Sequence, residues 1–344
     1  MRTVNCILPP HIVNRLGQNA DAALRDIAAA TLAIDARMRD QDRKPQLRGA
    51  LPDQPHLERR ISDAQGSEDL PGTPIRAEGD PPATDETVNE AYDKLGAVFK
   101  YYLDVHSRNA LDGAGGPLLA TVHYGQKYDN AFWDGTQMVF GDGDGSIFVN
   151  FTKSLDVVGH ELTHGVSADE ASGLLYQDQP GALNESISDV FGSMVKQYAL
   201  GQDVTQADWL IGNDILGPDF HGIALRSMAA PGTAYDDPQL GKDPQPAHMS
   251  KYVHTQDDNG GVHINSGIPN KAFHDASVAL GGHAWETAGK VWYAALLDPA
   301  MDGSLDFATF AGVTVRVAHT LPNGDKLASA VANAWTGVGV QPKS

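Results

Sequence analysis

The sequence is poor in cysteine, in positive charge and in long apolar runs. Cys6 is the only cysteine among 344 residues, so no disulfide can form within the chain and nothing indicates an oxidising compartment. The formal net charge is −19, from 25 basic and 44 acidic residues. This charge argues against nucleic acid or an anionic membrane as the main partner, because both select a basic face. No apolar run approaches the ~20 residues needed to span a bilayer.

The N-terminus also lacks the pattern of a secretory leader. The apolar stretch after Arg2 is interrupted by Asn5, Pro9 and Pro10, which makes it too short for the apolar core of a signal peptide. We therefore expect either export without a recognisable signal peptide or a cytoplasmic location. Hydrophobic residues make up 41% of the chain, enough for a sizeable core, and we expect a monomer.

Apolar spacing predicts a short N-terminal segment, then a strand-rich half and a mainly helical half. Residues 12–38 have helical periodicity, and the polar, proline-bearing stretch 40–60 is typical of an exposed linker. Thr87–Glu90 resembles a capping box that starts a long helix ending near Arg108. Strands are predicted at 118–124, 137–140 and 146–149, and helices at 154–166, 181–200, 266–280, 284–297, 305–319 and 323–336. The Gly-Asp-Gly-Asp-Gly stretch at 141–145 suggests calcium, but a plain turn is favoured because the EF-hand order is absent.

His160, Glu161 and His164 form an HExxH motif. On a helix, residues i and i+4 share one face, so both imidazoles can reach a single metal ion. Zinc suits two neutral imidazoles and one carboxylate, with a fourth position left for water. Alone, the pattern also fits a solvated helix with two incidental histidines. The apolar residues before it favour a buried helix instead.

A second acidic helix can complete this site. Glu185 in the sequence Asn-Glu-Ser-Ile-Ser-Asp can supply a third ligand, and Asp189, one turn later, can orient a ligand histidine. An acidic pair on a helix is usually a solvated face. Together with the upstream motif, however, it makes a complete set of two histidines and one glutamate.

Five motifs stand in the order and spacing of thermolysin-like (M4) metallopeptidases, namely VVGHELTHGV, GALNESISDVFG, NAFWDG, ALRSM and DNGGVHINSGI. The chain resembles this family over about residues 60–344. The resemblance implies an α+β, two-lobed fold with a β-rich N-terminal lobe and a mainly α-helical C-terminal lobe. It implies a propeptide and linker at 1–58, a first lobe at 59–166 ending in the HExxH helix, and a second lobe at 167–344.

The resemblance also implies a role for each matching residue. His160, His164 and Glu185 would bind one zinc ion, and Glu161 would activate water and pass its proton to the leaving amine. His263 and Tyr176 would stabilise the oxyanion, and Asp258 would support His263. Arg226 would hold a substrate carbonyl, and Asn130 and Ala131 would pair with the main chain of the substrate. Phe148, Val157 and Leu225 would form an apolar pocket. This pocket predicts a preference for bulky apolar residues just after the cut.

Two departures from the family pattern change what we expect. Lys196 stands where thermolysin has a carboxylate shared by two calcium ions, and its ammonium can bridge Asp156 and Asp208 instead. Calcium dependence is therefore not expected. The short N-terminal segment beginning Cys6-Ile-Leu-Pro9-Pro10 resembles that of the protealysin subgroup, whose short propeptide blocks the cleft. Cys6 could approach zinc as a thiolate, but a buried, inert cysteine is the favoured interpretation.

The chain is thus predicted to be a zinc endopeptidase made as a self-processing precursor. A catalytically inactive zinc-binding scaffold is the alternative, and a single-residue aminopeptidase is disfavoured because no motif would hold a substrate's amino terminus. Self-cleavage is expected before an apolar residue of the linker, at Gln46–Leu47, Ala50–Leu51, His56–Leu57 or Arg60–Ile61. The pair Arg59-Arg60 leaves a trypsin-like processor as a rival. The other histidines, His123 among them, are interpreted as ordinary surface or core residues.

Overall fold

The computed structural model describes residues 5–39, 54–170 and 174–343. The chain divides into two compact units. Unit 1 comprises Met1–Val166, Gly212–Ile223 and Asp236–Gly241, and unit 2 comprises Ser167–Ile211, Ala224–Tyr235 and Lys242–Ser344. The main sheet belongs to unit 1 and most of the helices to unit 2, which agrees with the predicted order of a strand-rich half before a helical half.

Unit 1 is built around a six-stranded mixed sheet. Its strands are β1 (Asn5–Cys6), β2 (Arg59–Asp63), β3 (Thr73–Ala77), β4 (Leu118–Val122), β5 (Ala131–Trp133) and β6 (Met138–Phe140). They lie in the order β1-β5-β6-β4-β2-β3. The central pairs β2–β4 and β4–β6 are parallel, whereas β1–β5, β5–β6 and β2–β3 are antiparallel. The sequence predicted only β4 and β6. Strands β1 and β5 have two and three residues, too few for an alternation, and β2 begins within the stretch 40–60 that was interpreted as a linker.

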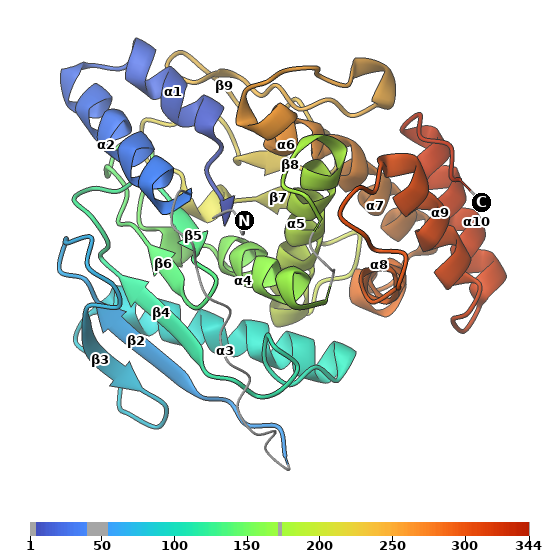
Figure 1. The fold of residues 1–344 in the computed structure, drawn as a ribbon, viewed down its shortest axis with the longest axis horizontal. Coiled ribbons are helices and arrows are strands. Elements are labelled where there is room, and N and C mark those ends of the chain that lie inside the picture. Colours follow the sequence, from blue (N-terminus) through green and yellow to red (C-terminus); the bar gives the residue numbers. More distant parts are fainter. Residues whose placement is uncertain (1–4, 40–53, 171–173, 344) are drawn as a thin grey trace. The chain divides into compact units, whose positions relative to one another are not determined.

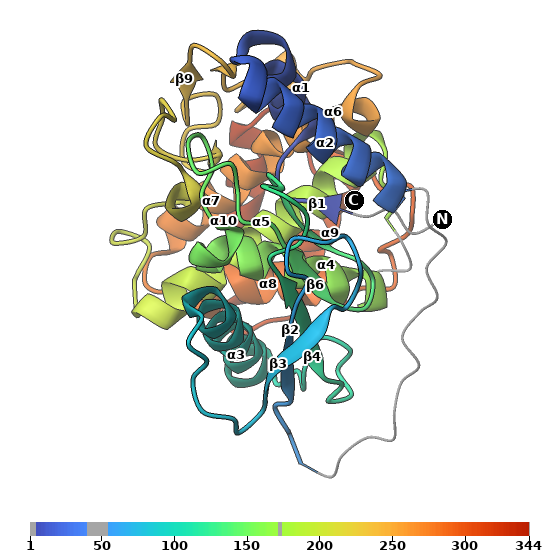
Figure 2. The ribbon, with the colours of Figure 1, turned by 90° about the vertical axis from the view of Figure 1, so that its left-hand side faces the viewer.

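Helix α3 (Glu86–His106) packs against β2, β3 and β4 (Figure 2). Its N-cap is Asp85, whose side chain accepts a hydrogen bond from Thr87 N at 2.8 Å. The capping residue therefore lies two positions before the predicted Thr87. The helix ends near the predicted Arg108, because Ser107 adopts a left-handed conformation with φ 55°.

The N-terminal segment, residues 5–39, consists of β1 followed by two helices that lie side by side (Figure 1). These are α1 (Pro10–Asn19) and α2 (Ala22–Arg39), so the continuous helical pattern predicted over 12–38 is interrupted at residues 20–21. Pro10 occupies the first turn of α1, where its missing N–H costs nothing. The side chain of Asp21 accepts from Leu24 N at 3.1 Å, within the first turn of α2.

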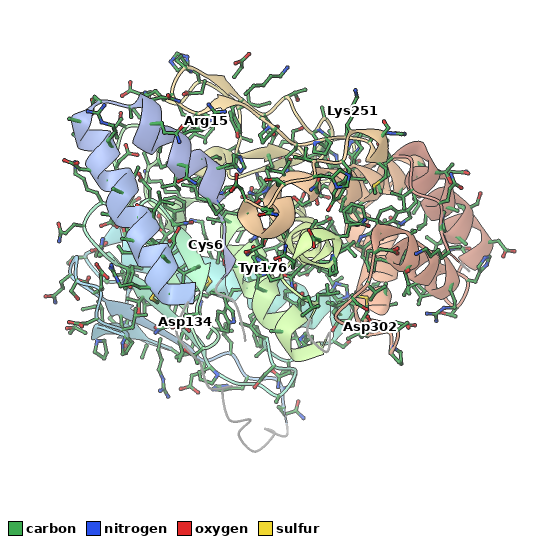
Figure 3. All side chains as sticks on the ribbon, turned by 45° about the horizontal axis from the view of Figure 1, so that its top comes forward. Cys6, Arg15, Asp134, Tyr176, Lys251 and Asp302 are labelled. Carbon is green, nitrogen blue, oxygen red and sulfur yellow. The ribbon has the colours of Figure 1, made fainter. Side chains whose placement is uncertain are left out.

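The N-terminal segment packs on the sheet through an apolar cluster. Cys6 of β1 is 2% exposed, and Figure 3 shows it between α2 and the sheet. The cluster contains Cys6, Ile34, Met38, Ala64, Tyr124, Tyr128, Phe132 and Val139. The surroundings of Cys6 in this cluster are thus mainly aromatic and aliphatic.

The predicted linker ends earlier than expected. Ile61 is 1% exposed and lies in β2, which pairs with β3 on one side and with β4 on the other. Arg59 donates two hydrogen bonds of 2.7 Å to Glu78. The Arg60–Ile61 bond is therefore held inside the sheet, and the interpretation of Arg59-Arg60 as part of an exposed linker is wrong.

The other predicted cleavage bonds are placed differently. Gln46–Leu47 and Ala50–Leu51 lie outside the described residues. His56–Leu57 lies in irregular chain before β2, where His56 is exposed.

The stretch 141–145 is irregular chain, and a bend follows at residues 145–147. Asp144 Oδ1 accepts from Ser146 N at 2.6 Å and from Ile147 N at 2.8 Å, which is how an aspartate commonly stabilises a turn. The following residues, 146–149, were predicted to be a strand. They form only an isolated bridge between Phe148 and Leu216.

Unit 2 consists of packed helices with a short strand pair. Helix α4 (Leu155–Glu170) begins in unit 1, and the remaining α-helices are α5 (Asp178–Leu200), α6 (Asp258–Asn265), α7 (Gly267–Leu280), α8 (Ala288–Leu296), α9 (Phe307–Ala318) and α10 (Gly324–Gly337). The short strands of unit 2 are β7 (Leu210–Ile211) and β8 (Arg226–Ser227), whereas β9 (Asp236–Asp237) lies in unit 1 and β10 (Gly241–Lys242) begins at the last residue of unit 1. The 3₁₀ turns are η1 (Phe151–Lys153) and η2 (Asn213–Ile215) in unit 1, and η3 (Met249–Lys251) and η4 (Ala284–Glu286) in unit 2.

Aromatic side chains form part of the core of unit 2. The rings of Trp292 on α8 and Trp335 on α10 stack with 7° between their planes, and Phe310 on α9 lies edge-on to both. Among the described residues, no helix combines the length and the apolarity needed to cross a membrane.

Candidate active site

Helix α4 presents two histidines on one buried face. His160 is fully buried and His164 is 3% exposed, and their Nε2 atoms lie 3.1 Å apart. The helix is buried because Val157, Val158 and Leu162 are each 0% exposed. The predicted buried helix is therefore present, and the alternative of a solvated helix with incidental histidines is wrong.

Glu161, the residue between the two histidines, is held by the sheet of unit 1. Its Oε2 accepts a hydrogen bond from the backbone N–H of Trp133 in β5 at 3.0 Å. Glu161 is 0% exposed, so this bond is shielded from water. Trp133 lies in the motif NAFWDG, but nothing in the sequence indicated that its backbone would bond to Glu161.

In unit 2, three residues from separate motifs converge. Tyr176 OH donates a short hydrogen bond to Glu185 Oε1, and it lies 3.4 Å from His263 Nε2. The same His263 nitrogen lies 3.4 Å from Glu185 Oε2. Glu185 is 1% exposed and His263 is 4% exposed. The structure therefore brings the imidazole of His263 to a phenol and a carboxylate that lie about 80 residues earlier in the chain.

A strained turn positions His263. Asp258 has φ 52° and Asn259 has φ 50°, and Gly260 and Gly261 follow with φ 83° and 75°. A side chain at Gly260 would lie 2.1 Å from Asp178 Oδ1, so only glycine fits there. This left-handed run turns Asp258 back onto His263, where Oδ1 contacts Nδ1 at 2.7 Å and Oδ2 accepts from the backbone N at 2.9 Å.

The environment of His263 favours its protonated form. Burial acts to lower its pKa, but the nearby carboxylates of Asp258 and Glu185 outweigh burial and hold the pKa above its ordinary value. Gln245 further anchors this helix, since its Nε2 donates to the backbone oxygen of His263 at 2.7 Å and to Ser266 Oγ at 3.1 Å. Gln245 was missed by sequence reasoning because no local pattern marks it.

Asp189 and Arg226 form a buried pair in unit 2. The guanidinium donates to both carboxylate oxygens, through Nε at 2.9 Å and Nη2 at 2.8 Å. The side chains are 0% and 3% exposed. Asn270 Nδ2 adds a third donor to Asp189 at 2.8 Å. Such a forked ion pair fixes the plane of the guanidinium, and Asn270 is a further residue that the sequence did not reveal.

Asn130 and Ala131 lie beside the N-terminal segment in unit 1. Ile7 N donates to Ala131 O at 3.2 Å, and Leu8 N donates to Asn130 Oδ1 at 2.9 Å. Both residues therefore contact a peptide main chain, which in this structure belongs to the same molecule. Cys6 lies opposite Phe132 in the β1–β5 pair.

Each residue predicted to line the apolar pocket is buried. In unit 1, Phe148 and Val157 are 0% exposed, and the ring of Phe148 lies 5.9 Å from that of Phe220. In unit 2, Leu225 is 2% exposed and its N–H donates to Ile211 O at 3.0 Å.

Lys196 forms an ion pair with Asp208, one of the two carboxylates predicted to be its partners. Its Nζ donates to Asp208 Oδ2 at 2.8 Å, and its side chain is 9% exposed. In unit 1, Asp156 Oδ1 accepts from Ser154 Oγ at 2.7 Å and from Gly212 N at 3.0 Å.

His123 has two carboxylate partners, which the sequence did not indicate. Its Nδ1 contacts Asp142 Oδ1 at 2.8 Å, and its Nε2 contacts Asp85 Oδ2 at 2.9 Å. The hydrogen bond that His123 donates to the Asp142 carboxylate is the main cause that raises the pKa of His123 from 6.5 to about 9. His123 is therefore a structural ion-pair residue that links the start of α3 to the loop after β6.

Comparison with known proteins agrees with this arrangement. The family model described as the thermolysin metallopeptidase catalytic domain matches residues 48–168, and the model of its alpha-helical domain matches residues 172–340. The chain is 51% identical over 341 residues to an extracellular metalloprotease of Pectobacterium carotovorum, covering 99% of this chain and 97% of the relative. It is 45% identical to protease PrtS of Photorhabdus, covering 98% and 92% of the two chains.

A solved structure is similar along nearly the whole chain. The precursor of protealysin, a metalloproteinase from Serratia proteamaculans, matches with a TM-score of 0.89 and 50% identity, covering 98% of this chain and 99% of the other. The fold and the buried histidine motif thus define a metalloendopeptidase. The chain belongs to the thermolysin family of metallopeptidases, M4, and is protealysin-like within it.

Proposed function

We propose that the protein hydrolyses internal peptide bonds with one zinc ion bound by His160, His164 and Glu185. The observation that carries this proposal is the buried histidine pair of α4, with its Nε2 atoms 3.1 Å apart. Two nitrogens bound tetrahedrally to zinc at ~2.0–2.1 Å would lie roughly 3.3 Å apart, so the pair needs little adjustment. Glu185 supplies a buried carboxylate, the third ligand type that catalytic zinc sites use.

When bound, zinc acts as a Lewis acid that polarises the scissile carbonyl and makes water acidic enough for a carboxylate base. In this proposal Glu161 takes the proton from water at one carboxylate oxygen and later delivers it to the leaving amine. The hydrogen bond from Trp133 N to Glu161 Oε2 supports this role, because it orients the carboxylate without neutralising it.

We propose that His263 and Tyr176 stabilise the negative charge that develops on the carbonyl oxygen. An imidazole N–H and a phenol are both donors, and the contact of Asp258 with Nδ1 favours a ring that carries a proton on Nε2 when protonated. The left-handed turn and Asp258 hold the ring in place before substrate arrives, so little reorganisation is needed during the reaction.

The finer assignments also remain proposals. Arg226 would hold a substrate carbonyl, and its forked contact with Asp189 would keep the guanidinium in position. Asp189 would in addition orient a ligand histidine. Phe148, Val157 and Leu225 would line the pocket for the residue after the cut, and their burial supports a preference for bulky apolar side chains.

We propose that the N-terminal segment inhibits the enzyme until the enzyme itself removes it. The antiparallel pairing of β1 with β5 supports this, because the segment occupies the side-chain oxygen of Asn130 and the backbone oxygen of Ala131 that a substrate would use. That the similar solved structure is a precursor supports it further. The name of the Pectobacterium relative supports action outside the cell.

The test compares purified wild-type precursor with Glu161→Gln, each with a chelator and after zinc is restored. Peptide products from a mixed library are mapped by mass spectrometry. We expect wild type to cut before Leu, Ile or Phe only when zinc is present, and Glu161→Gln to be inactive although it binds zinc. Equal cleavage by both proteins, or cleavage unaffected by the chelator, would overturn the proposal.

A further inference from the structure

A buried carboxylate of the N-terminal segment contacts the residue proposed to pair with substrate. Asp35 lies on α2 and is 1% exposed. Its Oδ1 accepts a hydrogen bond from Tyr128 OH at 2.5 Å, and its Oδ2 accepts one from Asn130 Nδ2 at 3.1 Å. No step of the proposed chemistry uses Asp35.

The contact with Asp35 determines which way the Asn130 amide faces. Asn130 Oδ1 accepts from Leu8 N at 2.9 Å and from Ala131 N at 3.0 Å, while Nδ2 faces Asp35. A carboxylate can only accept hydrogen bonds, so the amide nitrogen must point toward it. The opposite orientation would set oxygen against oxygen at Asp35 and N–H against N–H at Leu8.

Helix α2 presents a second polar group to the same stretch of chain. Thr31 is one turn before Asp35 and is also 1% exposed, and its Oγ1 accepts from Asp129 N at 3.2 Å. Burial, and then the negative charge of Asp35, raise the pKa of Tyr128 well above its ordinary value. Its hydroxyl therefore stays protonated and remains a donor.

We propose that Asp35 is a positioning residue of the precursor, which locks Asn130 into the amide orientation that binds Leu8 and so sets β1 against β5. The proposal rests on the proposed inhibition by the N-terminal segment and adds the residue that makes the inhibition specific. Apolar packing alone would hold α2 on the sheet without fixing the register of β1, because apolar contacts have no direction. The carboxylate supplies that direction.

Replacing Asp35 should loosen β1 and leave the mature enzyme unchanged. Asp35→Ala leaves two buried donors, Tyr128 OH and Asn130 Nδ2, without this acceptor. Each such loss is expected to weaken the docking of the N-terminal segment on the sheet by about tenfold or more. Asp35→Asn keeps one acceptor for Asn130, so its effect should be intermediate. Because Asp35 belongs to the part that is removed, mature enzymes from all variants have the same sequence.

The experiment measures hydrogen exchange by mass spectrometry in precursors that also carry Glu161→Ala, which prevents processing. The Leu8 amide reports on β1, and the Ala20 amide, bonded to Leu16 O at 3.1 Å, reports on α1. We expect Asp35→Ala to speed Leu8 exchange by about tenfold or more, Asp35→Asn to speed it less, and Ala20 exchange to stay unchanged. Asp26→Asn, at an exposed position of α2, is the matched control and should change neither.

The same substitutions in active precursor should shorten the lag before activity appears, in the same rank order. Unchanged Leu8 exchange in Asp35→Ala would overturn the inference, and so would an equal loss of protection at Leu8 and Ala20, which would show a merely structural role. A separate result would contradict the proposed inhibition itself. If that inhibition is wrong, wild-type precursor will cleave peptides as fast as mature enzyme, whatever the exchange rate of the Leu8 amide.

Discussion

The backbone N–H of Trp133 donates to Glu161 Oε2 at 3.0 Å, so the strand that pairs with the N-terminal segment also holds the proposed catalytic base. The relationship is local to unit 1. It means that a shift of β5 changes both the pairing with an extended chain and the orientation of Glu161.

Replacement of Glu161 should abolish catalysis without removing the metal. Glu161→Gln keeps the acceptor for Trp133 N but cannot take a proton, so we expect activity to fall by ~10²–10⁴. Zinc content, measured by plasma mass spectrometry, should match that of wild type because Glu161 is not a proposed ligand. Retention of even roughly a tenth of the activity would be well outside this range and would contradict the assigned role.

Replacement of His263 should act on kcat more than on KM. A donor aimed at the developing charge is used in the transition state, so His263→Ala should lower kcat by ~10²–10³. His254→Ala, an exposed histidine of the preceding loop, is the control and should have little effect. Steady-state kinetics on one peptide substrate distinguish these outcomes. A change confined to KM would mean that His263 only binds substrate.

The pair formed by Lys196 and Asp208 should make calcium largely dispensable. Thermal melts in excess calcium and in a calcium-selective chelator should nearly coincide. Lys196→Met should lower the free energy of unfolding by about 1 kcal/mol, because the lost partner is buried whereas Asp208 itself is exposed to water. A calcium-dependent shift of about ten degrees in the wild type would correspond to several kcal/mol and would reveal a calcium site.

The ion pairs of His123 should make stability depend on pH in the alkaline range. The pKa of His123 is raised from 6.5 to about 9, so its contribution is fully present below pH 6.5 and is lost as pH rises through about 9. After discounting for solvent screening at this partly exposed site, we expect about 1–2 kcal/mol. Urea unfolding of wild type and His123→Gln at pH 7 and pH 10 measures it. The two proteins should differ at pH 7 and converge at pH 10, and a constant difference would disprove the linkage.

Maturation should require Glu161 and should not use the bond after Arg60. β2 holds Arg60 and Ile61 in the sheet, whereas a protease needs an extended, accessible chain. We expect a new N-terminus at Leu57 or earlier in the linker, and the same terminus in Arg60→Gln. N-terminal sequencing after incubation without other proteases tests this. Maturation of Glu161→Ala precursor at the wild-type rate would exclude self-processing.

The histidine pair could be predicted from the sequence because its geometry is local. The spacing of His160 and His164 alone places both on one face of a helix, whatever the rest of the chain does. The helices of unit 2 were predicted for the same reason, since their apolar periodicity is contained within each segment. By contrast, β1 and β5 have two and three residues, too few for a pattern.

Contacts between distant residues could not be predicted in this way. His123, Asp85 and Asp142 come from three separate parts of the chain, and no spacing in the sequence marks their meeting. The family resemblance supplied roles for Tyr176 and His263, but it did not indicate Gln245 or Asn270, which hold their neighbours through side-chain hydrogen bonds. Ile61 was misplaced because a buried strand and a linker with apolar residues look alike over a few positions.

The place of β1 at the end of the sheet has a consequence for which proteins the mature enzyme can digest. Once β1 has left, β5 is an edge strand only three residues long, with main-chain groups available to another chain. A chain can add to that edge only if its own backbone is unpaired over several residues, which excludes helices and strands inside a folded sheet. We therefore expect loops, termini and unfolded proteins to be cut, and compact native domains to be spared.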